Sequence, residues 1–350
     1  MAIGCEKEGE PTPLPGPEEP ADPVNVNLDD LPYASLSEYE FFAGDMKDLN
    51  PQESVLPYAL ISKLFTDYAE KKRFVWMPDG TSASYVDDHQ LLDFPSGTVI
   101  IKNFYYDGVL PSVDTRIIET RLLINRNGVW EFAEYVWNDE QTEAYLDMDG
   151  SYTPVSWVDG NGVQRDIEYR IPSGTECLVC HKKNSLPIPI GPKPQNLNAD
   201  YSFSDGVMNQ LDKWNEKGYL ADGYPDDIVT VVKWDDPTQD LRDRVRSYID
   251  INCGHCHAEG SHCDYRPMRF AYSETESDEN LGICVEPDEE LEPQLTHIIA
   301  SGNINRSMLY YRISSTDESV RMPLLGRSIV HEEAVEMIRE WIESLDPPCN

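Results

Sequence analysis

The sequence has no long apolar run and little positive charge. No stretch approaches the about 20 consecutive apolar residues that a membrane-spanning helix needs, so none is predicted. Only 28 Lys and Arg stand against 64 Asp and Glu, which gives a formal net charge of −36. Such a field repels nucleic-acid phosphates and anionic lipid surfaces, and we exclude both as binding partners. A basic protein partner, or a salty habitat, fits this charge better.

Two copies of the pattern CxxCH stand out in a chain of 350 residues. With eight Cys and seven His in the whole chain, two chance copies are not expected. The length and the 40% hydrophobic content also allow two or three compact domains, more than one short carrier domain needs. The motif residues are Cys177, Cys180 and His181 in the first copy, and Cys253, Cys256 and His257 in the second.

The CxxCH pattern has a direct chemical reading. Its two thiols can add across the two vinyl groups of a haem while the adjacent imidazole ligates the iron. Two motifs therefore predict two covalently bound haem c groups, with His181 and His257 as iron ligands. The competing interpretation is zinc, because two CxxC pairs could share one tetrahedral site and leave His181 or His257 idle. His255, inside the second motif, is expected to point away from the iron.

The second motif stands between two predicted amphipathic helices. Apolar residues follow helical spacing over 240–250 and again from His331 to Leu345. Met322 and Pro323 lie between the motif and the second helix. Helix, CxxCH, Met-Pro and a closing helix together resemble a class I cytochrome c domain, which would cover residues 236–350.

That resemblance assigns His257 and Met322 to opposite faces of the second haem iron. A neutral thioether favours Fe(II), so His/Met ligation would raise the reduction potential and suit one-electron transfer. The alternative is that Met322 is a core residue, as most methionines are. Met308 and His297 are then the next candidates for the ligand.

The first motif has a different setting, so the chain is not a tandem duplication. A strand and a loop over 168–176 lead into it, where a class I domain would have a helix. A helix predicted over 205–217 carries Met208, our candidate sixth ligand for the first haem. Met208 could equally be a packing or surface residue. His89 is a second candidate, and an open sixth position is a third.

Residues 28–172 read as mostly β. Runs of β-branched and aromatic residues at 73–76, 99–106 and 117–124 predict strands. Asn127-Gly128 and the turn at 159–162 each predict a hairpin. One helix is expected at 57–71.

The remaining cysteines bear on location. Met1 to Cys5 resembles the end of a lipoprotein signal, and the acidic, Pro-rich chain to residue 27 is typical of an extended tether. The alternative is an ordinary disordered terminus with a stray thiol. Cys263, Cys284 and Cys349 can form one disulfide, and the sequence does not choose the pair.

From about residue 31 to 350, the chain resembles an uncharacterised family of bacterial two-haem c-type cytochromes. The segments that carry the resemblance are 55–60, 73–81, 135–142, 190–198 and 321–327. The family is known as haem proteins, and the resemblance implies no particular substrate.

These observations predict an α+β chain in four parts. They are a signal remnant and tether (1–27), a β-rich domain (28–172), a first haem-binding segment that is irregular or helical (173–235), and an all-α class I cytochrome c domain (236–350). The expected function is electron transfer between a dehydrogenase or membrane carrier and an acceptor, through a redox partner with a basic docking face. The expected location is the periplasm or the outer membrane or cell surface of a Gram-negative bacterium, with a possible lipid anchor at Cys5. The alternative is a two-haem peroxidase-like enzyme with an open or displaceable ligand at the first haem.

Overall fold

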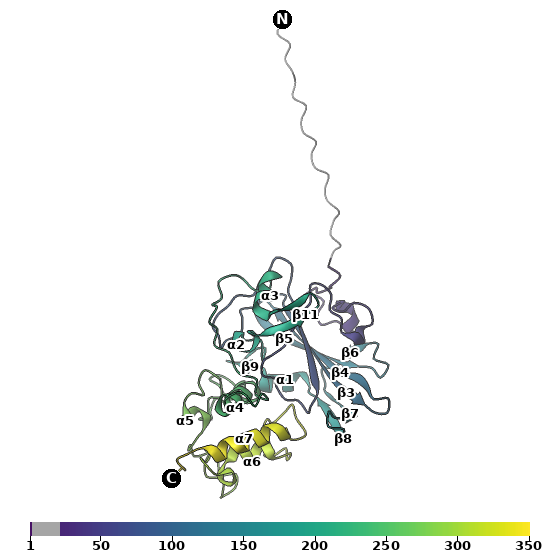
Figure 1. The fold of residues 1–350 in the computed structure, drawn as a ribbon. Coiled ribbons are helices and arrows are strands. Elements are labelled where there is room, and N and C mark those ends of the chain that lie inside the picture. The colour runs from purple at the N-terminus through teal and green to yellow at the C-terminus, as the bar shows by residue number, and fades with distance from the viewer. Residues whose placement is uncertain (2–21) are drawn as a thin grey trace.

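The computed structural model describes Met1 and residues 22–350. Eight antiparallel strands form one sheet, in the order β1-β2-β3-β4-β5-β6, with β7 pairing β3 and β8. Their bounds are Leu56–Tyr58, Glu70–Trp76, Val99–Val109, Asp114–Arg126, Val129–Trp137, Ala144–Leu146, Ser151–Val158 and Gln164–Ile171 for β1 to β8. Figure 1 shows this sheet on one side of the molecule and the C-terminal helices on the other, with α1 between them.

Both predicted hairpins are confirmed. Asn127 and Gly128 join β4 to β5 and both have positive φ, the conformation that a two-residue hairpin turn requires. The second turn joins β7 to β8, and Asp159 accepts hydrogen bonds from the backbone of Asn161 and Val163 there. Long β-branched and aromatic strands thus pair where the sequence indicated.

Small elements connect the sheet to the C-terminal part. They are the short helices η1 (Leu36–Tyr39), η2 (Met46–Asp48), α1 (Gly174–Cys180), α2 (Pro194–Leu197) and α3 (Gln210–Glu216), and the two-stranded pairs β9 (Lys182–Lys183) with β10 (Leu186–Pro187) and β11 (Asp200–Phe203) with β12 (Gly206–Asn209). Both α1 and β10 pack against β5.

Two predicted helices in this part are wrong or too long. Residues 57–71 form the end of β1, a set of turns and the start of β2. The backbone N–H groups of Ala59 and Ser62 there are satisfied by the side chains of Gln210 and Asn196 instead of by helical bonds. The helix expected at 205–217 begins only at Gln210, because the residues before it pair in β12.

The prediction of an all-α class I cytochrome c domain at the C-terminal end is wrong, and the described chain is mainly β. Its C-terminal part holds α4 (Leu241–Ile249), the π-helical turn η3 (Asp250–Gly254), α5 (Asp278–Leu281), η4 (Ile304–Arg306), α6 (Met308–Ser314) and α7 (Glu332–Ser344). The two amphipathic helices that the periodicity indicated are present as α4 and α7, and they pack on each other.

The chain between α4 and α7 explains the difference. Residues 255–303 are mostly turns and bends, and parallel bridges join Ile283 to Ile299 and His297 to Ser307. Gly260, Gly282 and Gly302 all have positive φ in this stretch, which a helix cannot accommodate. Two helices with the expected spacing were therefore insufficient evidence for a helical domain.

Apolar clusters lie on both faces of the sheet and around α4 and α7. One cluster joins the sheet to residues near α2 and α3, and a second covers the other face and includes partly buried Val24 and Val26 from the predicted tether. The third, which includes Trp341 and Ile342, is the core of the C-terminal part. In the described residues, none of the helices has the length and apolar character to cross a membrane.

Candidate functional site

The first CxxCH motif lies on a short helix held at its start by side chains. Ser173 and Glu176 form a reciprocal capping box at the N-terminus of α1, and Arg170 forms an ion pair with Glu176. Cys177 and Cys180 are three residues apart on this helix and so lie on one face. Two thiols must lie on the same face in this way if both are to bond covalently to one planar group.

His181, directly after α1, is positioned as a neutral ligand. Its Nδ1 lies 2.9 Å from the carbonyl oxygen of Ile188, and because a carbonyl only accepts, Nδ1 carries the proton. The Phe132 ring lies 5.2 Å from the imidazole between centroids. Burial lowers the pKa of His181 to about 4, and the Lys102 charge adds to this effect. The remaining nitrogen, Nε2, is therefore an unprotonated donor for a metal at neutral pH.

The second motif is delivered by α4 and the turn η3. Asp240 caps α4 by accepting hydrogen bonds from the backbone of Arg242 and Asp243. The turn η3 continues the helix to Gly254 and contains Cys253. Burial raises the pKa of the Cys253 thiol to about 12, so this thiol is protonated at neutral pH.

His257 is buried at the end of this segment. Only 8% of its surface is exposed, and burial lowers its pKa to about 4. Phe270 packs on it with ring centroids 5.1 Å apart. Within the described chain its Nδ1 is buried and has no hydrogen-bond partner. An unsatisfied buried nitrogen is costly to a folded protein, so a metal ion or a hydrogen-bond donor or acceptor bound at Nδ1 would remove that cost.

The structure brings the two motifs together, which the sequence did not predict. The Sγ atoms of Cys180 and Cys256 and a ring nitrogen of His255 all lie within 4.8 Å of one another. The interaction between these two thiols lowers the pKa of Cys180 and raises the pKa of Cys256. Of the site residues, His255 is the one that sequence reasoning missed, since we expected it to point away.

Backbone contacts fix this junction. The N–H of Asn184, just after the first motif, donates to the carbonyl of Gly260, just after the second, at 2.8 Å. Gly260 has a φ of +73°, and a Cβ there would collide with the Asn184 side chain. Cys256 Sγ also lies 3.7 Å from the carbonyl oxygen of Val179. The two motifs are therefore held in direct contact.

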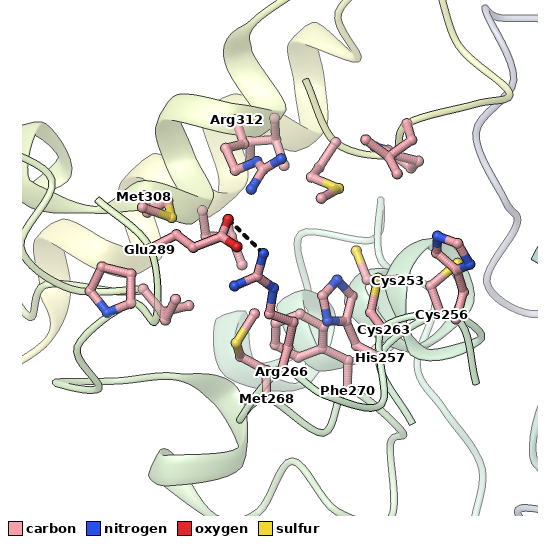
Figure 2. Close-up of a pocket in the computed structure, with 18 of the residues that line it drawn as sticks. Cys253, Cys256, His257, Cys263, Arg266, Met268, Phe270, Glu289, Met308 and Arg312 are labelled. Atoms are coloured by element: carbon pink, nitrogen blue, oxygen red, sulfur yellow. Dashed lines mark hydrogen bonds and ion pairs between the residues drawn. The ribbon is translucent and has the colours of Figure 1, made fainter. Parts of the chain in front are cut away.

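A cavity of about 340 Å³ opens beside the second motif. Figure 2 shows Cys253, Cys256 and His257 on one side of it, with Met308 and Arg312 of α6 on the opposite side. Its lining also includes three sulfur ligand candidates, namely Met268, Met308 and Met322. An ion pair of 2.8 Å between Arg266 and Glu289 lies across it. The volume is in the range of a small-molecule or cofactor site.

The other candidate ligands lie elsewhere. Met208 is on β12 and is 36% exposed. His89 is in a loop, with Nδ1 2.5 Å from the side-chain oxygen of Gln195. His297 Nδ1 contacts the Thr296 hydroxyl at 2.9 Å and is outside the lining of the cavity.

Among the remaining cysteines, Cys284 and Cys349 form a disulfide. Cys263 is a free, buried thiol in the wall of the cavity. Cys5, the expected lipid anchor, and most of the predicted tether lie outside the described residues.

The residues present fit a haem at each motif. Each site offers two thiols about one turn apart, followed by a neutral imidazole, and the second offers an adjacent cavity with thioether sulfurs. The group Cys180, His255 and Cys256 could instead hold a metal ion directly. No family model, curated protein or solved structure matches the chain.

Proposed function

We propose that the protein is a two-haem c-type cytochrome that transfers single electrons in the bacterial cell envelope. The observation that carries this proposal is the pair of CxxCH motifs, each ending in an imidazole whose pKa is lowered to about 4 by desolvation. A neutral imidazole is the form that ligates iron. Because both pKa values lie well below 7, His181 and His257 are already neutral at neutral pH.

Each bound haem would supply an iron that cycles between Fe(III) and Fe(II). The chain contributes the tethers Cys177, Cys180, Cys253 and Cys256 and the ligands His181 and His257. Met322 is the proposed distal ligand at the second site, because it lines the same cavity as His257. This assignment rests on the cavity lining and does not require a class I cytochrome c fold. Met208 stays a weaker proposal for the first site, since it lies on an exposed strand.

The contact between the motifs supports electron exchange within the chain. The second cysteine of one motif touches the second cysteine of the other, so haems attached there would have their tethered edges close together. The acidic surface implied by the net charge of −36 favours a redox partner with a basic docking face.

An optical redox titration of protein produced with haem-attachment machinery tests the proposal. We expect a reversible haem spectrum that titrates with two electrons per chain. A chain that matures in such a host without any redox-active chromophore would contradict the proposal.

One observation favours a second candidate, a structural metal site. Cys180, His255 and Cys256 supply two thiols and an imidazole, which is close to a zinc ligand set. The first cysteine of each motif is outside this group, so the four thiols do not form the single shared site that the simplest zinc interpretation requires. Stoichiometric zinc with free thiols in the native protein would favour this candidate over haem.

A further inference from the structure

A row of polar and charged side chains crosses five strands of the sheet on the face toward the first motif. The register pairs Tyr58 with Arg73, Arg73 with Lys102, Lys102 with Arg121, and Arg121 with Glu134. Directly paired residues project to the same face of a sheet. The row therefore places three basic side chains side by side, which we call the cation row: Arg73, Lys102 and Arg121.

The cation row is only partly neutralised by protein groups. Arg121 forms ion pairs with Glu119 at 2.5 Å and with Glu134 at 3.2 Å. Lys102 lies over the Phe104 ring, 4.7 Å from its centroid, and has no ion pair with any described residue. Like charges directly opposite each other destabilise a sheet, so the row costs the fold free energy unless an anion joins it.

Arg73 gives a second and independent sign of a missing anion. It is 5% exposed, and its Nη2 atom is buried with no hydrogen-bond partner in the part of the chain that the structure describes. Burying a guanidinium group with an unsatisfied N–H is expensive, because the lost hydration is not replaced. A carboxylate matches the geometry of a guanidinium group, because its two oxygens can accept two parallel N–H hydrogen bonds.

The first motif lies over this face. Helix α1 packs on β5, the strand next to Arg121, and Phe132 of β5 contacts His181. Phe132 is paired with Leu123, which lies two residues from Arg121 on the same face of β4. A group tethered at Cys177 thus begins near the Arg121 end of the row.

The dimensions match a haem lying along the row. Arg73 is two strands from Arg121, a separation of about 10 Å. A haem tethered through its vinyl edge carries two propionate carboxylates on its opposite edge, so propionates would lie toward the Lys102 and Arg73 end. We infer that Lys102 and Arg73 bind the propionates of the haem attached at Cys177 and Cys180. This inference rests on the proposed function and adds the residues that orient the first haem.

The test uses the haem-loaded protein and a charge-neutral replacement, Lys102→Met, with Lys72→Met as the matched control. Lys72 is the exposed neighbour of Arg73 on β2 and projects to the opposite face. A cation beside a haem stabilises Fe(II), so its removal should lower the potential of one haem only. We expect about a tenfold change in the Fe(II)/Fe(III) ratio at fixed potential, which is about 59 mV for one electron.

Resonance Raman spectra of the same samples report the propionate bending modes directly. We expect these modes of one haem to shift in Lys102→Met, to be restored in Lys102→Arg, and to be unchanged in Lys72→Met. If Lys102→Met does not retain its haems, Arg73→Gln provides the same two readouts. Unchanged potentials and unchanged propionate modes in a variant with both haems attached would overturn the inference.

Two further results separate this inference from its alternatives. A chain without covalent haem refutes the proposed function itself. If added succinate raises the thermal midpoint of the haem-loaded protein and this increase is absent in Lys102→Met, the row binds a free carboxylate. That result would also overturn the propionate assignment.

Discussion

The two motif sites share the five-residue pattern CxxCH and differ in almost everything around it. The first lies on a short helix that packs on β5, in the same sheet as Lys102 and Arg121. The second ends α4 inside the apolar C-terminal core, beside a cavity that three methionines line. In the proposed cytochrome, the pattern CxxCH would specify attachment and one ligand, whereas the surrounding fold would set the charge, polarity and distal ligand at each iron.

Removing the tethers of one site is expected to have the largest effect. Cys177→Ala with Cys180→Ala should leave one covalent haem per chain, and so should Cys253→Ala with Cys256→Ala, because in the proposed cytochrome each pair would hold its own haem. The pyridine haemochrome assay and denatured mass spectra measure the count. Cys263→Ala is the control and should retain two haems, since Cys263 is outside both motifs. Loss of both haems in either double variant would mean that the sites do not load independently.

The distal side of the second site is expected to distinguish it from the first. If Met322 ligates that iron, the oxidised protein has a weak near-infrared band typical of His/Met iron. Met322→His should abolish the band and lower the potential of one haem, because imidazole stabilises Fe(III) better than a thioether does. Haem content should not change.

Met268→Leu and Met308→Leu are the controls for this assignment, because both residues line the same cavity. Leu is close to Met in volume, so a packing role is nearly preserved. A band that survives in Met322→Leu and disappears in Met308→Leu would move the ligand to Met308.

The disulfide should affect the second site and leave the first unchanged. Cys284–Cys349 joins residues 65 apart in sequence and ties the chain end to the C-terminal core. Replacing both cysteines with Ser should lower the free energy of unfolding by about 4 kcal/mol, because the unfolded chain gains freedom. Chemical denaturation followed at each haem's spectrum measures this. Equal destabilisation of both sites would show that the protein unfolds as a single cooperative unit.

The smallest predicted effect is a pH dependence near the second site. His331 stacks on Phe65 at 4.0 Å and contacts the Tyr248 hydroxyl at 3.0 Å. Burial lowers its pKa to about 3, and the Lys71 and Arg327 charges contribute. Since the folded pKa lies below the usual value of about 6.5, stability is complete above pH 6.5 and falls as the pH decreases toward 3.

His331→Asn should remove part of that decline, since Asn does not titrate. The measurement is the free energy of unfolding at several pH values in both proteins. Exposed Glu333, 3.9 Å from His331 Nε2, favours the charged imidazole, so Glu333→Gln should make the decline slightly steeper. Parallel curves for the wild type and His331→Asn would show that His331 titrates normally in the folded protein.

Local signals predicted the parts of the structure that depend on nearby residues. Asn127-Gly128 indicated its hairpin because few residues tolerate the positive φ of that turn, and the apolar spacing in α4 and α7 indicated both helices. The expected helix at 57–71 failed because tertiary bonds from Gln210 and Asn196 replace helical bonds there. The helical C-terminal domain failed because the chain between its two helices is made of turns.

Features of the site that depend on distant contacts could not be predicted. The approach of Cys180 to Cys256 arises from the packing of α1 against the turn after α4, which no sequence spacing encodes. The cation row depends on the register of two strand pairs, β2 with β3 and β3 with β4, and a shift of one residue would move its members to the other face. Sequence patterns therefore predict the attachment residues, and only the fold relates the two motifs to each other.

The most direct test of two covalent haems is the intact mass of the denatured, native-source protein together with its iron and zinc content. The account predicts a mass increased by two haems, two irons per chain and no stoichiometric zinc, because all four motif thiols are used as thioethers. An unmodified polypeptide mass with free thiols at Cys177, Cys180, Cys253 and Cys256 would contradict it.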